Sequence, residues 1–344
     1  MNLAHFWTLR DCTGIDLWDP DAEPSLHQSG YGHSFLELYV RLRRAGHQVS
    51  IGSEIPVDRA AVVVCLEELS GWKRHGAPSK TIRLCWRLLR RKVPLVVIRN
   101  DVHPHIRAPY CASLEFLPTT ASVQHPDRQC VLPLLPQRGL RPRSDSRLSH
   151  IEFVGLKTYS QNVPDWVPEL ERLLAPHGVG VRVDTEEGDS HDWADFVELD
   201  SVLCFQPSAT LGDARRKPAT KLINAWAAGV IPICEPHTAY TEIAEPGRDS
   251  LFATTPEAIV GWVARLNQDH ELASALFAGA QRRGAEFSTS LILARWADAL
   301  TGLKPVTRRR VLTEIAICLT QLGLGPRASQ RLVTVIQARH DSHR

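Results

Sequence analysis

Two lysines and an asparagine lie at the start of a helix-like segment within residues 217–236, KPATKLINAWAAGVIPICEP. The helical composition begins at Lys221 and ends at Gly229, where an apolar strand-like run takes over. Lys217, Lys221 and Asn224 therefore lie near the helix N-terminus, which carries free N–H groups and a partial positive charge. Cations add to that charge, so the pattern favours docking of an external anion such as a phosphate. The alternative interpretation is a solvated basic loop.

Three residues in the first half of the chain are candidates for proton transfer. His33 lies in a glycine-containing stretch, and Asp101 and His103 follow the end of an apolar run over residues 94–100. A histidine or a carboxylate so placed can take a proton from a hydroxyl group. The alternative is that each is a loop residue with a local hydrogen bond.

Two α/β halves would position these residues. Strand-like runs alternate with helix-like segments in both halves, which implies parallel βαβ units. We expect domains over residues 1–135 and 150–303, a Pro- and Arg-rich hinge over 136–149, and a helical tail over 304–344. The expected fold is α/β with two Rossmann-like domains facing a cleft, followed by C-terminal helices. Because ligands bind beyond the carboxyl ends of the strands in such sheets, we expect the binding site in the cleft between the domains.

Composition narrows the class of protein. A chain of 344 residues is longer than a typical single domain, so we expect two domains. Its content of 43% hydrophobic and 23% charged residues is ordinary for a globular protein. A net charge of +2 argues against a nucleic-acid partner. The eight cysteines show neither C-x-x-C nor zinc spacing, so we expect reduced, buried thiols. With no signal-like start and no apolar run of about 18 residues, the expected location is the cytoplasm.

Three stretches resemble one known family. Residues 222–252, LINAWAAGVIPICEPHTAYTEIAEPGRDSLF, are similar to the donor-binding half of GT-B glycosyltransferases. Residues 30–52, GYGHSFLELYVRLRRAGHQVSIG, resemble the first turn and helix of that fold, and residues 153–162, FVGLKTYSQN, resemble the first strand of its donor domain. The resemblance touches both halves and leaves the tail unexplained.

The resemblance implies transfer of a sugar from a nucleotide-activated donor to an acceptor hydroxyl, as in hexosyltransferases of EC 2.4. It implies that Lys157, Lys217 and Lys221 contact the donor diphosphate. Glu242 falls where the family has a ribose-binding or helix-capping glutamate, and Tyr240 would flank the base or the sugar.

On the acceptor side, Gly30 and Gly32 would let the backbone approach a ligand closely. His33, Asp101 and His103 are the candidate bases, and a retaining enzyme of this fold would need none. The acceptor would be a carbohydrate or another hydroxyl compound. We expect no metal and no cofactor beyond the nucleotide sugar itself.

The chain departs from the family at a pair of glutamates, whose places are taken by Arg216 and Asn224. We expect Asn224 to hydrogen-bond a ribose hydroxyl of the donor, less strongly than a carboxylate would. Glu235 or Glu242 would have to supply the missing carboxylate. Because of this departure, two alternative functions remain open. One is a catalytically silent nucleotide-sugar-binding protein, and the other is an epimerase or a phosphorylase on the same fold. A nicotinamide site is poorly supported, because GYGHSF lacks the last glycine of the fingerprint and follows a loop.

The tail is basic, with eight Lys and Arg against two Asp and Glu over residues 304–344. Its apolar residues Leu312, Ile315, Ala316 and Leu319 recur at helical spacing. We expect this helix to dock back onto the body. The alternative is contact with a partner or with the surface of a membrane, at its inner face.

Overall fold

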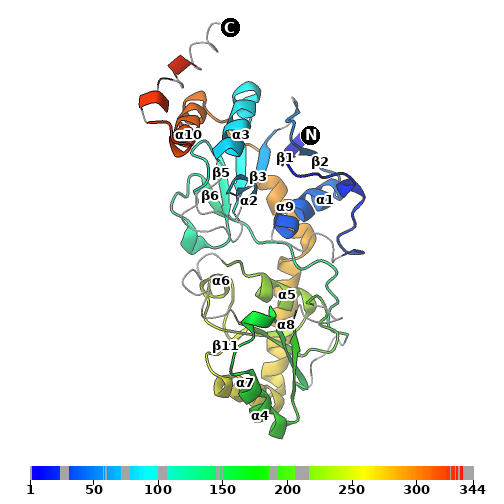
Figure 1. Cartoon of the computed structure of the whole chain (residues 1–344). Helices are drawn as coiled ribbons and strands as arrows, with labels where there is room; N and C mark the ends of the chain where they lie inside the picture. The colour runs from blue at the N-terminus through cyan, green and yellow to red at the C-terminus, as the bar shows by residue number, and fades with distance from the viewer. Residues whose placement is uncertain are drawn as a thin grey trace.

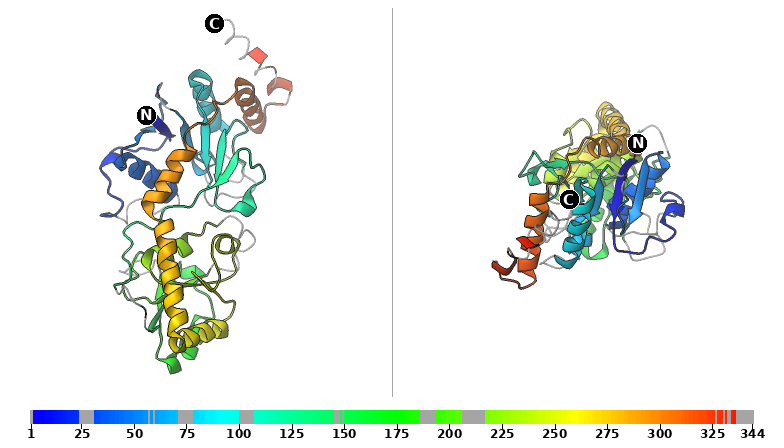
Figure 2. Two further views of the ribbon diagram at one scale, coloured as in Figure 1. Left: turned by 180° about the vertical axis from the view of Figure 1, so that it is seen from behind. Right: turned by 90° about the horizontal axis from the view of Figure 1, so that it is seen from above.

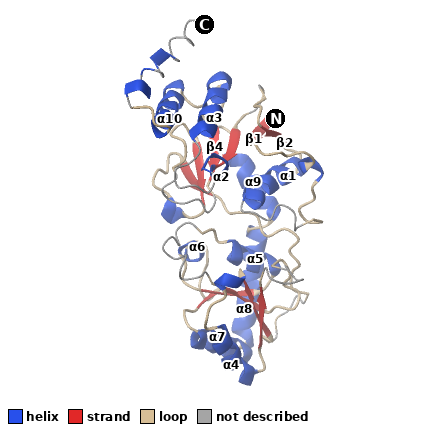
Figure 3. Cartoon of the chain, in the orientation of Figure 1, coloured by secondary structure: helices blue, strands red, loops and turns tan. Residues whose placement is uncertain are grey.

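The computed structural model describes residues 2–23, 31–56, 58, 60–70, 78–99, 107–144, 148, 150–185, 193–205, 217–325, 327–329, 331 and 334–335. They form two units, one above the other in Figure 1, each built on its own parallel sheet. Figure 3 shows helices flanking both sheets. The predicted α/β class with two Rossmann-like domains is confirmed.

The first sheet has the order β2-β1-β3-β4-β5-β6, with every neighbouring pair parallel. Its strands are β1 (Asn2–Trp7), β2 (Gln48–Gly52), β3 (Val62–Cys65), β4 (Leu95–Ile98), β5 (Leu114–Leu117) and β6 (Gln129–Val131). Its helices are η1 (Ile15–Leu17), η2 (Gly32–Leu36), α1 (Glu37–Arg44), α2 (Leu66–Ser70), α3 (Pro78–Arg91) and η3 (Thr120–Ser122). The central strands β3 and β4 are buried throughout, which explains their continuous Val, Leu and Ile runs.

The second sheet has the order β11-β10-β9-β7-β8 and is also parallel. Its strands are β7 (Phe153–Lys157), β8 (Gly180–Asp184), β9 (Ser201–Cys204), β10 (Ile231–Cys234) and β11 (Leu251–Phe252). Its helices are η4 (Ser160–Asn162), α4 (Val167–Leu174), η5 (Ala175–His177), α5 (Thr220–Ala228), α6 (Thr238–Thr241), α7 (Pro256–Gln268) and α8 (His270–Glu286).

Both sheets reverse their order at the same place. In the first, β1 lies between β2 and β3, and in the second, β7 lies between β8 and β9. Such a reversal leaves a crevice beyond the carboxyl ends of the strands, where ligands of α/β proteins bind. The loops that follow β1, β7, β9 and β10 are therefore the places to look for functional side chains.

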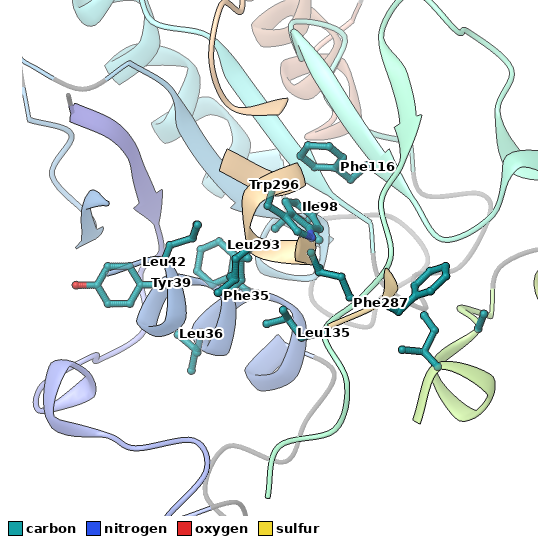
Figure 4. Packing of buried hydrophobic residues seen from close by; sticks show 14 of the residues in the cluster. Phe35, Leu36, Tyr39, Leu42, Ile98, Phe116, Leu135, Phe287, Leu293 and Trp296 are labelled. Atoms are coloured by element: carbon teal, nitrogen blue, oxygen red, sulfur yellow. The ribbon is translucent and has the colours of Figure 1, made fainter. Parts of the chain in front are cut away.

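Helix α9 (Thr289–Ala299) joins the first domain although it follows the second in sequence. Figure 2 shows the chain running up from α8 into the upper unit. There the Trp296 ring packs 4.3 Å, centroid to centroid, from Phe116, and its Nε1 donates to the Pro133 carbonyl at 3.2 Å. Figure 4 shows Leu293 and Trp296 among side chains of the first domain. The return to the first domain thus begins at Thr289, ahead of the expected boundary at 303.

Helix α10 (Arg308–Gln321) docks onto the first domain beside α3. Val311, Leu312 and Ile315 are buried in the same apolar cluster as Leu84 and Leu88 of α3. The buried Glu314 carboxylate accepts hydrogen bonds from the Tyr110 N–H and from the Arg107 guanidinium. The predicted docking of the tail is confirmed as far as residue 321. Among the described helices, none is long and apolar enough to cross a membrane.

Close helix packing holds α5 in place. Gly284 of α8 lies against the end of α5, and a Cβ there would come within 2.3 Å of the Trp226 carbonyl oxygen. A side chain at this position would therefore push α8 away from α5. Gly229 ends α5 in the left-handed conformation, with φ of 69°.

Candidate functional site

The N-terminal turn of α5 carries the two predicted lysines. Lys217 lies three residues before the helix, and Lys221 is its second residue. The Lys221 ammonium donates to the Phe205 carbonyl at 2.7 Å, at the carboxyl end of β9. Burial lowers the pKa of Lys221 to about 8, and the neighbouring charge of Lys217 acts in the same direction, whereas Glu235 opposes it. The Ala219 N-cap supplies no side-chain acceptor, so positive potential accumulates here.

His237 adds a polar group that sequence analysis missed. It follows β10 and caps α6, where its Nδ1 accepts a hydrogen bond from the Ala239 N–H at 3.2 Å. The residue is only 3% exposed, and its Nε2 is buried without a hydrogen-bond partner among the described residues. Burial and the charge of Lys217 lower the pKa of His237, and Glu242 opposes them. The signal in the sequence was a histidine at an N-cap position, before Thr238.

Asn224 is engaged by the segment between the domains. Its Oδ1 accepts from the Gln137 N–H at 2.8 Å, and its Nδ2 donates to the Gln137 Oε1 at 3.3 Å. The expected role, a hydrogen bond to a ribose hydroxyl, competes with these contacts for the same two groups. In this structure, Asn224 attaches α5 to the linker.

Tyr240 lies in the core, with its side chain fully buried and its ring 5.2 Å from that of His237. The expectation that it flanks a bound base or sugar stays a prediction, and in this arrangement the ring has no exposed face for stacking on a ligand.

Lys157 occupies the carboxyl end of β7, as the resemblance implies, but it is buried and ion-paired. Its ammonium lies 2.7 Å from Asp184 Oδ2 and 4.7 Å from the centroid of the Phe196 ring. Burial lowers the pKa of Lys157, and the hydrogen bond to Asp184 opposes that shift. The predicted diphosphate contact would require the ligand to share or break this pair.

Glu242 reaches across to the first domain. Its two carboxylate oxygens accept hydrogen bonds from the Thr120 and Ala121 N–H groups, each at 2.8 Å. These are free N–H groups at the start of η3, which follows β5. Glu242 therefore caps a helix of the opposite domain, and segments beyond the carboxyl ends of β5 and β10 meet here.

His33 forms a histidine–carboxylate pair with a residue that sequence analysis missed. Its Nδ1 lies 2.9 Å from Glu37 Oε2, and the Glu37 side chain is completely buried. Burial raises the pKa of Glu37, but the hydrogen bond to His33 and the charges of His33 and Arg41 outweigh it, and the net shift is downward. When the ring is neutral, an ionised Glu37 selects the tautomer with hydrogen on Nδ1, and Nε2 then carries the lone pair.

The Nε2 of His33 is buried without a hydrogen-bond partner within the described part of the chain. The spacing His33-x-x-x-Glu37 on an amphipathic helix was the signal for the pair.

Of the other predicted residues in the first domain, Gly32 is the first residue of η2. Gly30, Asp101, His103 and Arg216 lie outside the described residues.

Adjacent linker residues connect the two halves of the site. Gln137 holds Asn224 of α5, and the next residue, Arg138, lies with its Nη1 3.8 Å from Glu37 Oε2. Burial lowers the pKa of Arg138, and Glu37 opposes that shift. The His33 pair and α5 thus lie on two sides of one short stretch of backbone. Within the described residues, no group of three or more His, Cys, Asp or Glu side chains could hold a metal ion.

Comparison with known proteins agrees with this architecture. Residues 198–297, which include α5 and His237, match the family model described as "Glycosyl transferase-like". The solved structure of Anabaena HepE in complex with UDP and glucose is 12% identical, with a TM-score of 0.52 over 88% of this chain and 100% of that one. Sucrose-phosphate synthase from Thermosynechococcus elongatus is 10% identical, with a TM-score of 0.48 over 87% of this chain and 98% of that one.

No curated protein matches the sequence. The likeness to HepE shows the fold, and the family model covers only the later part of the second domain. The chain therefore has the GT-B fold, and residues 198–297, which hold β9, β10 and β11 of its second sheet, are similar to a glycosyl transferase-like family.

Proposed function

We propose that the chain is a glycosyltransferase that moves a sugar from a nucleotide-activated donor to an acceptor hydroxyl. The observation that carries the proposal is the connection between the two halves of the site through Gln137 and Arg138. It brings a histidine–carboxylate pair to the same linker as α5, the helix whose N-terminal end carries Lys217 and Lys221. A base and a site for a departing anion are the two elements that direct transfer to a hydroxyl needs.

The residues divide the chemistry between them. His33 Nε2 takes the proton of the acceptor hydroxyl as its oxygen bonds to the anomeric carbon. The bond between that carbon and the diphosphate breaks, and the electron pair leaves with the nucleoside diphosphate. Lys217 and Lys221 stabilise the charge that grows on this leaving group. Glu37 stabilises the imidazolium that forms on His33.

The donor is proposed to be a nucleoside diphosphate hexose, which makes the enzyme a hexosyltransferase of EC 2.4. The support is that the HepE structure, which shares the fold, holds UDP and glucose. The acceptor is proposed to be a carbohydrate or another hydroxyl compound. No metal and no further cofactor enter this proposal. The proposed setting is the cytoplasm, with peripheral contact of the basic tail with the inner face of the membrane.

Incubation of the full chain with UDP-, GDP- and dTDP-hexoses, with and without a panel of hydroxyl acceptors, tests the proposal. We expect release of nucleoside diphosphate from one donor, faster when an acceptor is present. Thermal stabilisation without release would instead indicate a silent binding protein. Conversion to an isomeric nucleotide sugar would indicate an epimerase, and release that depends on inorganic phosphate would indicate a phosphorylase.

Lys221→Ala is the matching variant, with Lys304→Ala as its control because Lys304 is an exposed lysine in the segment before α10. The donor site predicts weaker binding of nucleoside diphosphate in the first variant alone. Equal affinity in both variants would contradict the placement of the diphosphate at α5.

A further inference from the structure

The two ring nitrogens of the buried His237 have the opposite donor and acceptor roles to those of His33. In His33, Nδ1 faces a carboxylate, so the neutral ring carries its proton on Nδ1 and leaves Nε2 as an acceptor. In His237, Nδ1 accepts from the Ala239 N–H, so the neutral ring carries its proton on Nε2. His33 is arranged to take a proton, and His237 is arranged to donate a hydrogen bond.

The Nε2–H of His237 is a buried donor without an acceptor among the described residues. Leaving such a donor unpaired costs the full free energy of its desolvation, which is why buried polar groups nearly always have partners. The side chain is 3% exposed, so bulk water is not a ready substitute. A ligand oxygen would satisfy it.

The surroundings of His237 indicate which oxygen. Lys221 donates to the Phe205 carbonyl directly after β9, and His237 follows β10, whose last residue Cys234 pairs with Cys204 at the end of β9. In agreement with this, the charge of Lys217 lowers the pKa of both His237 and Lys221. The cationic turn of α5 and the His237 ring therefore share one neighbourhood beyond the carboxyl ends of β9 and β10. A phosphate group accepts hydrogen bonds and donates none when ionised, which suits a lysine pair and a neutral imidazole N–H together.

We propose that His237 binds the diphosphate of the nucleotide donor, with its Nε2–H donating to a phosphate oxygen beside Lys217 and Lys221. The inference rests on the proposed function and deepens it. A neutral hydrogen-bond donor helps to orient the phosphate group without adding a third cation to the site. Its hydrogen bond strengthens as charge grows on the leaving diphosphate, so His237 acts on the rate of transfer as well as on binding.

Two substitutions separate this role from the capping of α6. His237→Asn keeps a side-chain acceptor for the Ala239 N–H, since asparagine is a good N-cap, but has no donor at the place of Nε2. His237→Gln carries an amide N–H group near the place of Nε2 and gives up the capping acceptor. We expect the Asn variant to bind nucleoside diphosphate about tenfold more weakly, and the Gln variant to recover most of that loss.

The measurement is calorimetric titration of the full chain with UDP, GDP and dTDP and with the matching nucleotide hexoses, with thermal unfolding as the check on folding. Equal weakening for the nucleoside diphosphate and the nucleotide sugar supports the diphosphate contact. An effect confined to the nucleotide sugar would assign His237 to the sugar and overturn the inference. So would normal binding by the Asn variant with a loss in the Gln variant, which is the signature of capping alone.

The outcomes also distinguish this inference from the proposed function. If the wild-type chain binds none of the nucleotides, both fall together. If the wild-type chain binds and Lys221→Ala weakens binding while His237→Asn does not, the donor site stands and only the role of His237 is lost.

Discussion

Gln137 and Arg138 are neighbours in the chain, and each faces a different domain. Gln137 exchanges two hydrogen bonds with Asn224 of α5, whereas Arg138 lies 3.8 Å from the buried carboxylate of Glu37. A shift of this linker would change both contacts at once. The position of the His33 pair relative to α5 is therefore coupled to two consecutive residues.

Removal of the His33 pair should slow transfer strongly and leave donor binding intact. His33→Gln removes the base, and we expect the rate of transfer to fall roughly 10²–10⁴-fold, which is the usual contribution of a general base. Glu37→Gln should cause a loss in the same range, because an amide can donate to Nδ1 and favour the tautomer whose Nε2 carries a proton. The measurement is single-turnover transfer, with calorimetric titration of nucleoside diphosphate alongside.

The exposed histidine His177 provides the control for that experiment. His177→Gln should retain wild-type transfer. If His33→Gln transfers sugar at the wild-type rate, another group is the base, and Asp101 and His103 become the candidates to substitute next.

Binding of nucleoside diphosphate should weaken as the pH rises past about 8. The pKa of Lys221 is lowered to about 8, so its ammonium begins to lose its charge there, well below the usual range for lysine. Loss of a cation disfavours an anionic ligand, and the bound anion raises the pKa of the same group. We therefore expect the dissociation constant to rise up to about tenfold per pH unit above 8, until the pKa of the complex is reached.

Lys221→Arg is the matched variant, since guanidinium keeps its charge throughout this range. Its binding should stay level between pH 7.5 and 9.5, whatever its absolute affinity. A wild-type profile that is flat over the same interval would mean that Lys221 does not titrate against the ligand.

The contact of Glu242 with η3 should hold the two domains together. Glu242→Gln leaves one oxygen acceptor in place of two charged ones, and we expect a loss of about 1 kcal/mol in the free energy of unfolding, since these hydrogen bonds are partly exposed. The radius of gyration from X-ray scattering should also increase or broaden. The control is Glu245→Gln, whose ion pairs stay within the second domain.

If the Glu242 variant instead keeps its stability and compactness but loses affinity for nucleosides with a free ribose, the carboxylate binds the donor as the family resemblance implies. The same variant and its control therefore tell the two outcomes apart.

Asn224→Ala should destabilise the protein without weakening donor binding. The substitution leaves the Gln137 N–H and Oε1 without their partners, which costs roughly 1–3 kcal/mol. A double-mutant cycle with Gln137→Ala, followed by thermal unfolding, should show a coupling energy above about 0.5 kcal/mol. A large loss of nucleoside diphosphate affinity with no coupling to Gln137 would show that Asn224 serves the donor instead.

Local features of the sequence predicted much of this molecule. Alternating apolar runs and amphipathic segments predicted both parallel sheets, because the periodicity of a strand or a helix is written in a few neighbouring residues. Gly229 marked the end of α5, and so placed Lys217 and Lys221 at its N-terminal turn. The same kind of local signal identified His33 as a candidate base and predicted the docking of α10.

Only the tertiary structure decided which partner each polar side chain has. Lys157 pairs with Asp184, 27 positions away, and Asn224 with Gln137, 87 positions away. Glu242 caps a helix 122 positions earlier in the chain, and the core encloses Tyr240. His237 and Glu37 were overlooked because burial and the missing partner of a ring nitrogen arise from packing between distant segments. The sequence by itself determined the elements and the residues at their ends, whereas the contacts that give those residues a role depend on how the two domains and the linker come together.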